Sequence, residues 1–166
     1  MAVSQQTYER VALKDPDGRW ELHGGRLREK PGTTWAHKQI GTMLGFQLLR
    51  RLNPDRFHVR IDQGRMRFAD ETYYIPDICV VPAEYSLPLR DRQDVLEVYD
   101  ELLPLVAEVW SPLTGEYDID AKVPGYQRRG DLEIWRVHPY ERAVIAWRRQ
   151  PDGSYAEASF EGETVE

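Results

Sequence analysis

The chain has 166 residues and a formal net charge of −6; 41% of its residues are hydrophobic and 30% are charged. This composition is typical of one folded domain over residues 1–166, large enough to bury a core. It excludes a protein that coats nucleic acid through a broad basic surface. No apolar run approaches the roughly 20 residues that span a bilayer. The sequence starts without the basic and apolar stretches of a signal peptide, and the single cysteine, Cys79, cannot form an internal disulfide, so we expect a cytoplasmic protein.

The charges are unevenly distributed along the chain. Residues 70–120 hold thirteen acids against two arginines, whereas residues 50–67 and residues 121–149 each carry four more bases than acids. Such segments can hold a phosphate or a divalent cation locally. Solvated surface charges are the simpler explanation from composition alone.

The first half of the chain predicts a hairpin, a helix and two strands. Residues 19–29 alternate apolar and polar side chains around Gly24-Gly25, which suits a tight hairpin turn. Residues 34–52 place apolar side chains on one helical stripe. Residues 57–62 and 64–68 alternate as half-buried strands do.

The stretch "TYYIPDICVVP", residues 72–82, is apolar on both faces and is typical of an inner strand. Its exception is Asp77, whose ionised carboxylate costs several kcal/mol to bury unless something offsets it. The polar residues 83–101 that follow have no clear pattern, and we expect at most a short helix near residues 95–102.

A second buried strand, residues 102–110, repeats this oddity because "LVAEVW" contains Glu108 among apolar residues. Residues 118–130 predict a helix that begins near Asp120, since a proline is tolerated in a first helical turn. Three more strands are predicted at residues 132–137, 143–147 and 155–160. The whole is an α/β or α+β fold with a mixed sheet and hairpins at both ends.

The two buried acids predict a metal site if their strands are neighbours. Asp77 and Glu108 would then converge, and two close carboxylates require either a proton or a cation between them. A hard divalent ion that prefers oxygen ligands, Mg²⁺ or Mn²⁺, is the natural partner. A single buried acid is more often paired with an arginine or a backbone cap, so spacing alone leaves both interpretations open.

Lys122 follows Glu108 by fourteen residues, on the first turn of the predicted helix. A strand, turn and helix of that length can return an ammonium to the two acids. Two carboxylates, a metal and a lysine are what metal-assisted phosphodiester hydrolysis requires.

The ordered motifs "WELHGGRL", "TTWAHKQI", "IPD", "AEVWSP", "DIDAK" and "IWRVHP" resemble the Uma-type family of putative restriction endonucleases, a bacterial branch of the PD-(D/E)xK nuclease superfamily. The likeness covers roughly residues 19–140. In the wider superfamily the lysine lies two residues after the second acid, where this chain has Trp110. The Uma-type pattern has a lysine on the following helix, which Lys122 matches.

This resemblance implies a restriction-endonuclease-like core, a mixed sheet flanked by helices, with Asp77 and Glu108 as metal ligands and Lys122 as the third catalytic residue. Three further residues match recurrent family positions. His37 and Tyr126 are expected either beside the site or as ordinary core residues. Glu21 could approach the metal, although an ordinary hairpin charge is the favoured interpretation.

We therefore expect a Mg²⁺- or Mn²⁺-dependent endonuclease that acts on DNA rather than RNA, with no other cofactor. A homodimer would suit double-strand cutting. The alternative is a catalytically inactive nuclease-fold module that serves in binding or assembly, which the acidic net charge favours.

Overall fold

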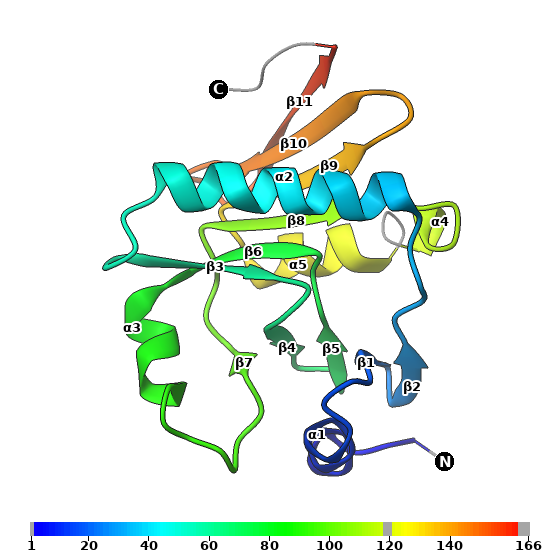
Figure 1. Cartoon of the computed structure of the whole chain (residues 1–166), viewed down its shortest axis with the longest axis vertical. Helices are drawn as coiled ribbons and strands as arrows, with labels where there is room; N and C mark the ends of the chain where they lie inside the picture. Colours follow the sequence, from blue (N-terminus) through cyan, green and yellow to red (C-terminus); the bar gives the residue numbers. More distant parts are fainter. Residues whose placement is uncertain (1, 118–120, 163–166) are drawn as a thin grey trace.

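The computed structural model describes residues 2–117 and 121–162, and within them the chain forms two mixed sheets flanked by helices (Figure 1). The helical segments are α1 (Gln5–Lys14), α2 (Trp35–Arg51), α3 (Ala83–Ser86), the 3₁₀ turn η1 (Leu87–Leu89), α4 (Gly115–Tyr117) and α5 (Val123–Arg129). The strands are β1 (Trp20–His23), β2 (Arg26–Glu29), β3 (Phe57–Ile61), β4 (Arg65–Phe68), β5 (Thr72–Tyr74), β6 (Ile78–Pro82), β7 (Val98–Tyr99), β8 (Leu105–Val109), β9 (Glu133–His138), β10 (Ala143–Arg149) and β11 (Tyr155–Glu161). The predicted fold class and both terminal hairpins are confirmed.

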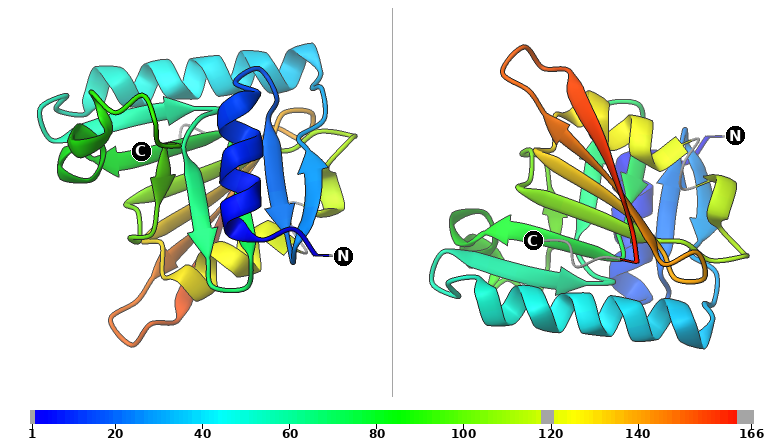
Figure 2. Two further views of the ribbon diagram at one scale, coloured as in Figure 1. Left: turned by 90° about the horizontal axis from the view of Figure 1, so that it is seen from below. Right: turned by 90° about the horizontal axis from the view of Figure 1, so that it is seen from above.

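The larger sheet has six strands in the order β11-β10-β9-β8-β6-β3. Only β8 and β9 pair in parallel in this order, because the passage through α4 and α5 brings the chain back across the sheet. The long helix α2 covers one face and α5 lies on the other (Figure 2). That double cover explains why β6 and β8 are apolar on both sides.

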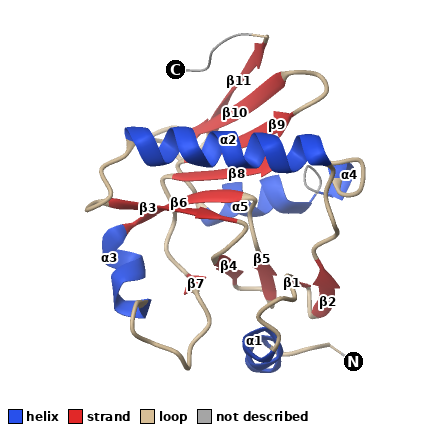
Figure 3. Ribbon diagram, in the orientation of Figure 1, coloured by secondary structure: helices blue, strands red, loops and turns tan. Residues whose placement is uncertain are grey.

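The smaller sheet has the order β2-β1-β5-β4-β7 and lies beside the larger one (Figure 3). Its outer face carries α1, an N-terminal helix that the sequence patterns above did not predict. Ser4 caps this helix by accepting from the amide of Thr7, and Tyr8 and Ala12 pack on Leu22 in a buried apolar cluster. The spacing of Tyr8 and Ala12 by one turn was the available signal.

The main core lies between the two sheets and α5. It joins apolar residues of both sheets to the first turns of α5, and the free thiol of Cys79 is buried within it, as predicted. Burial raises the pKa of this thiol well above its ordinary value, so Cys79 is core packing rather than a nucleophile.

The stretch 72–82 is not the single strand that its apolar run predicted. It divides into β5 in the smaller sheet and β6 in the larger sheet, and Asp77 lies in the connection between them. Both halves are buried, so periodicity could not reveal that the chain changes sheet. Pro76 stands in this connection and cannot donate to a ladder hydrogen bond.

The prediction of a short helix near residues 95–102 is also wrong. Helical turns occur earlier, in α3 and η1, whereas Val98 and Tyr99 form β7, parallel to β4. Tyr99 is 1% exposed, so its burial against the core decided the local structure. The predicted helix over residues 118–130 is confirmed in its described part as α5; Asp118 and Asp120 lie outside the described residues.

The C-terminal end of α5 allows a test of whether the backbone conformation there requires glycine. Gly130 caps it with φ of 89°, a left-handed conformation that costs other residues about 1–2 kcal/mol. We expect Gly130→Ala to lower the free energy of unfolding in urea by that amount. The matched control is Gly41→Ala within α2, where an added Cβ meets no atom within 4 Å; it should raise stability by about 0.5–1 kcal/mol. Equal effects of the two changes would contradict this account.

Candidate active site

The candidate site lies where the chain crosses from the smaller sheet to the larger one. Strands β6 and β8 pair antiparallel, with Ile78 opposite Ala107, so the same register carried on by one residue brings Asp77 to Glu108. The amide of Val109 donates to Asp77 Oδ2 at 2.7 Å. The two acids are therefore neighbours in the backbone register of β6 and β8, as predicted for adjacent strands.

Asp77 is 4% exposed, and two cationic or polar side chains hold its carboxylate in addition to that amide. Lys30 Nζ lies 2.6 Å from Oδ1, and His37 Nε2 lies 3.1 Å from Oδ2. The same ammonium lies 2.6 Å from Asp62 Oδ1, so Lys30 bridges two carboxylates. Arg19 also pairs with Asp62, at 2.5 Å, on the more exposed side of the site.

The charges of this group stabilise one another. Burial alone would raise the pKa of Asp77, but Lys30 and His37 hold that pKa well below its ordinary value. Burial acts to lower the pKa of Lys30, but the negative charges of Asp77, Glu108 and Asp62 together more than offset it, so that pKa is raised. Both groups are therefore ionised at neutral pH.

A second ionic group surrounds Lys122, which is 1% exposed. Its ammonium lies 2.7 Å from Glu21 Oε1 and 3.3 Å from Glu108 Oε1. Glu21 also accepts the amide of Ile75 at 2.8 Å, and the hydroxyl of Tyr126 donates to Glu108 Oε1 at 2.6 Å. Glu21 and Glu108, both about 1% exposed, thus share one lysine.

Helix α5 delivers Lys122 to these acids. Lys122 is the N-cap residue, and Pro124 occupies the first turn, where its missing N–H costs nothing. Gly125 lets the helix approach closely, because an added Cβ would stand 3.2 Å from Tyr74 and 3.3 Å from Phe68. The Pro-Gly pair therefore fits the helix start and seats α5 against the smaller sheet.

The structure brings all six predicted site residues into one region: Glu21, His37, Asp77, Glu108, Lys122 and Tyr126. The favoured interpretation of Glu21 as an ordinary hairpin charge is wrong. Its carboxylate points into the core, where the connection after β5 supplies an amide and α5 supplies an ammonium.

Trp110, at the position where the wider superfamily has its lysine, takes no part in these contacts. Its ring stacks on His138 with centroids 4.3 Å apart and packs edge-on against Tyr140.

Sequence reasoning missed Lys30, Asp62 and Arg19. A signal existed for Lys30, because Glu21 pairs with Arg28 across the β1–β2 hairpin. Side chains alternate along a strand, so an inward Glu21 places Lys30, two residues beyond Arg28, on the same face. Nothing in the periodicity of residues 57–62 distinguished Asp62, whose backbone has a positive φ of 54°.

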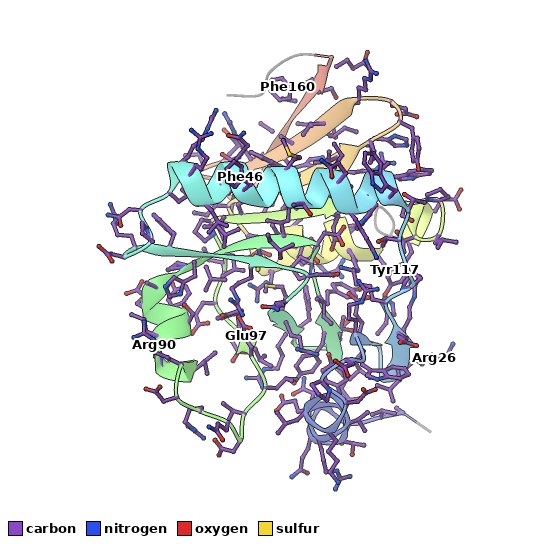
Figure 4. The ribbon with its side chains drawn as sticks, in the orientation of Figure 1. Arg26, Phe46, Arg90, Glu97, Tyr117 and Phe160 are labelled. Carbon is purple, nitrogen blue, oxygen red and sulfur yellow. The ribbon has the colours of Figure 1, made fainter. Side chains whose placement is uncertain are left out.

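A small cavity of about 10 Å³, which is room for about one water molecule, lies between the two ionic groups. Glu21, Lys30, His37, Asp77 and Lys122 line it, with Arg28 at its edge. The guanidinium of Arg28 lies 3.6 Å above the ring of Tyr117, which Figure 4 labels. The cavity is thus lined by basic and acidic side chains together.

Carboxylate oxygens are the correct donors for Mg²⁺ or Mn²⁺, which often use one or two carboxylates and complete their shell with water or phosphate. Within the described residues, no three His, Cys, Asp or Glu side chains form a group that could hold a metal ion by themselves. Asp77 and Glu108 fit such an ion chemically, on the condition that the ammonium now on Asp77 can move.

Comparison with models of protein families shows to which family this chain belongs. The model of the Uma2 family, described as putative restriction endonuclease, matches residues 5–166. The chain belongs to the Uma2 family. A comparison with curated proteins found no match.

A solved structure shares the Uma2 fold. It is a putative nuclease belonging to DUF820 from Anabaena variabilis ATCC 29413, with a TM-score of 0.69 and 19% sequence identity. The match covers 86% of this chain and 76% of that one. Among the described residues, no helix has the length and hydropathy needed to cross a membrane.

The hydrogen bond from Tyr126 to Glu108 can be tested without changing any charge. Tyr126→Phe removes a buried donor to a carboxylate, so we expect the free energy of unfolding to fall by about 1.5–3 kcal/mol. Tyr140→Phe, at a ring that is 56% exposed, is the matched control and should change it by less than about 0.5 kcal/mol. If the two variants lost similar amounts of unfolding free energy, the hydrogen bond from Tyr126 to Glu108 would not be especially stabilising.

The shared lysine predicts strong coupling between Lys122 and Glu21. Lys122→Met leaves buried carboxylates without this cation and should cost about 3–5 kcal/mol. Adding Glu21→Gln removes one of those charges, so the double variant should lose less than the sum of the single variants. A double-mutant cycle from urea unfolding measures this difference, and strict additivity would argue against the pair.

Proposed function

We propose that this protein is a metal-dependent phosphodiester hydrolase that acts as a DNA endonuclease. The observation that supports this proposal is that Asp77, directly before β6, and Glu108, on the neighbouring strand β8, lie opposite each other, with the ammonium of Lys122 3.3 Å from Glu108. Membership of a family described as putative restriction endonucleases adds to it, as does the fold shared with a putative nuclease.

In this proposal Asp77 and Glu108 would hold Mg²⁺ or Mn²⁺. When bound, such an ion lowers the pKa of a coordinated water and withdraws charge from the phosphate. His37 and the Val109 amide fix the orientation of the Asp77 carboxylate, and Tyr126 fixes that of Glu108.

Lys122 is proposed to orient the attacking water or to neutralise charge that develops on the phosphate. Glu21 keeps its ammonium in place, which leaves less reorganisation for the transition state. Burial in a site of low dielectric strengthens each of these electrostatic contacts. Arg28 at the edge of the cavity is suited to contact the phosphate backbone.

Three finer features complete the proposal. DNA is favoured over RNA as the substrate by the resemblance to restriction endonucleases. A homodimer would place two sites on the two strands of a duplex. The cytoplasm is the proposed compartment, in agreement with a single free thiol buried in the core.

A second function, an inactive nuclease-fold module for binding or assembly, is favoured by one observation. The ion pairs of Lys30 and Lys122 already compensate Asp77, Glu21 and Glu108 without a metal. A site whose buried charges are compensated by the protein can persist as structure alone.

The decisive test is cleavage of supercoiled plasmid and of single-stranded DNA with Mn²⁺, with Mg²⁺ and with EDTA. We expect cleavage that requires the metal and is lost in Asp77→Asn and in Glu108→Gln. The matched control is Asp17→Asn, at an exposed turn, which should cleave as the wild type does.

Thermal unfolding of the same samples separates the two functions. An ion that binds only the folded protein raises the melting temperature, so Mn²⁺ should stabilise the wild type and not Asp77→Asn. A melting temperature indifferent to metal, together with no cleavage of either DNA, would favour the inactive module.

A further inference from the structure

Lys30 has the environment of a bound cation rather than that of an ordinary lysine. It is 6% exposed, and its ammonium lies 2.6 Å from one oxygen of Asp77 and 2.6 Å from one oxygen of Asp62. Neither the family pattern nor the proposed reaction assigns this residue a role.

We propose that Lys30 is a built-in counter-cation of Asp77 and sets the affinity of the site for a divalent ion, because its ammonium must leave Asp77 before an ion can bind there. This inference rests on the proposed function of the site. It makes Lys30 a residue that competes with the metal rather than one that holds it.

The contacts of Asp77 explain the competition. Oδ1 accepts from Lys30, and Oδ2 accepts from the Val109 amide and contacts His37, so protein groups engage both oxygens. A divalent ion on Oδ1 would meet the ammonium at close range, and two positive charges there repel strongly. Only one of the two cations can occupy that oxygen.

Asp62 offers Lys30 a position to which it can withdraw. The amide of Asp62 donates to the backbone carbonyl of Asp77 at 2.7 Å, so the two acids are held at a fixed separation. The side chain of Asp62 is 35% exposed, against 5% for that of Asp77, and it therefore lies toward solvent. The flexible stem of Lys30 can keep its bond to Asp62 while releasing Asp77.

The backbone of Lys30 does not have to move for this exchange. Its amide donates to the carbonyl of Arg19 at 2.8 Å at the end of the β1–β2 hairpin, which anchors the main chain. Arg19 already pairs with Asp62, so the withdrawn ammonium would share that carboxylate. The exchange is thus a change of side-chain rotamer between two fixed acids.

The first experiment measures Mn²⁺ binding by calorimetry in the wild type, Lys30→Met and the control Lys38→Met, whose lysine is exposed on α2. If Lys30 occupies Asp77 in about nine-tenths of wild-type molecules or more, its removal should tighten binding about tenfold or more. Lys38→Met should bind as the wild type does. Adding Asp77→Asn to Lys30→Met should abolish the gain.

A second measurement needs no variant. The chain has four lysines, of which Lys30 and Lys122 are buried and Lys14 and Lys38 exposed. Reductive methylation read by mass spectrometry should show Lys30 protected in EDTA and modified in saturating Mn²⁺. Lys122 should stay protected in both, and the two exposed lysines should react in both.

The outcomes distinguish this inference from the proposed function. If the wild type binds Mn²⁺ but Lys30→Met binds no more tightly, or Lys30 stays protected with the metal, the inference is overturned while the nuclease proposal stands. If neither protein binds Mn²⁺, both fall. Should Lys30→Met fail to fold, Lys30→Gln retains a hydrogen-bond donor without the charge and serves the same comparison.

Discussion

The buried charge of Asp77 is the constraint on which the site depends. A carboxylate with 4% exposure must be compensated within the protein, and three separate parts of the fold contribute. The hairpin end supplies Lys30, the start of α2 supplies His37, and β8 supplies the Val109 amide. Because these groups come from distant parts of the sequence, the site exists only when both sheets and α2 are in place.

The passage of the chain between two sheets makes such a site possible. Residues 75–77 leave the smaller sheet and enter the larger one, so polar groups at this connection cannot all be paired by ladder hydrogen bonds. The carboxylate of Glu21 satisfies the Ile75 amide, and its other neighbour is the ammonium of Lys122. The connection over residues 75–77 therefore accounts for the positions of two buried acids that line the cavity. Asp77 lies within the connection, and Glu21 accepts a hydrogen bond from its Ile75 amide.

The site also contains buried cations that the positions of the acids alone do not predict. Carboxylates in neighbouring strands suggest a metal, yet each of the two ionic groups contains a buried lysine. Lys30 helps to keep Asp77 ionised by lowering its pKa, and Lys122 contacts both Glu21 and Glu108. In the proposed function, a preorganised arrangement of this kind suits electrostatic catalysis, and a bound ion would compete with the protein's own cations.

The sequence by itself determined which residues are candidates for the site, and it determined most of the helices and strands. Asp77 and Glu108 were evident because an acid interrupts an apolar run, and Lys122 because its helix follows at a short distance. The ordered motifs singled out Glu21, His37 and Tyr126, and only for Glu21 was an ordinary hairpin charge the favoured interpretation. Only the tertiary structure decided that residues 72–82 divide between two sheets, and that Lys30 meets Asp77 across 47 positions of the chain. Local patterns report which face of an element is buried; which distant charges meet there depends on how the sheets pack.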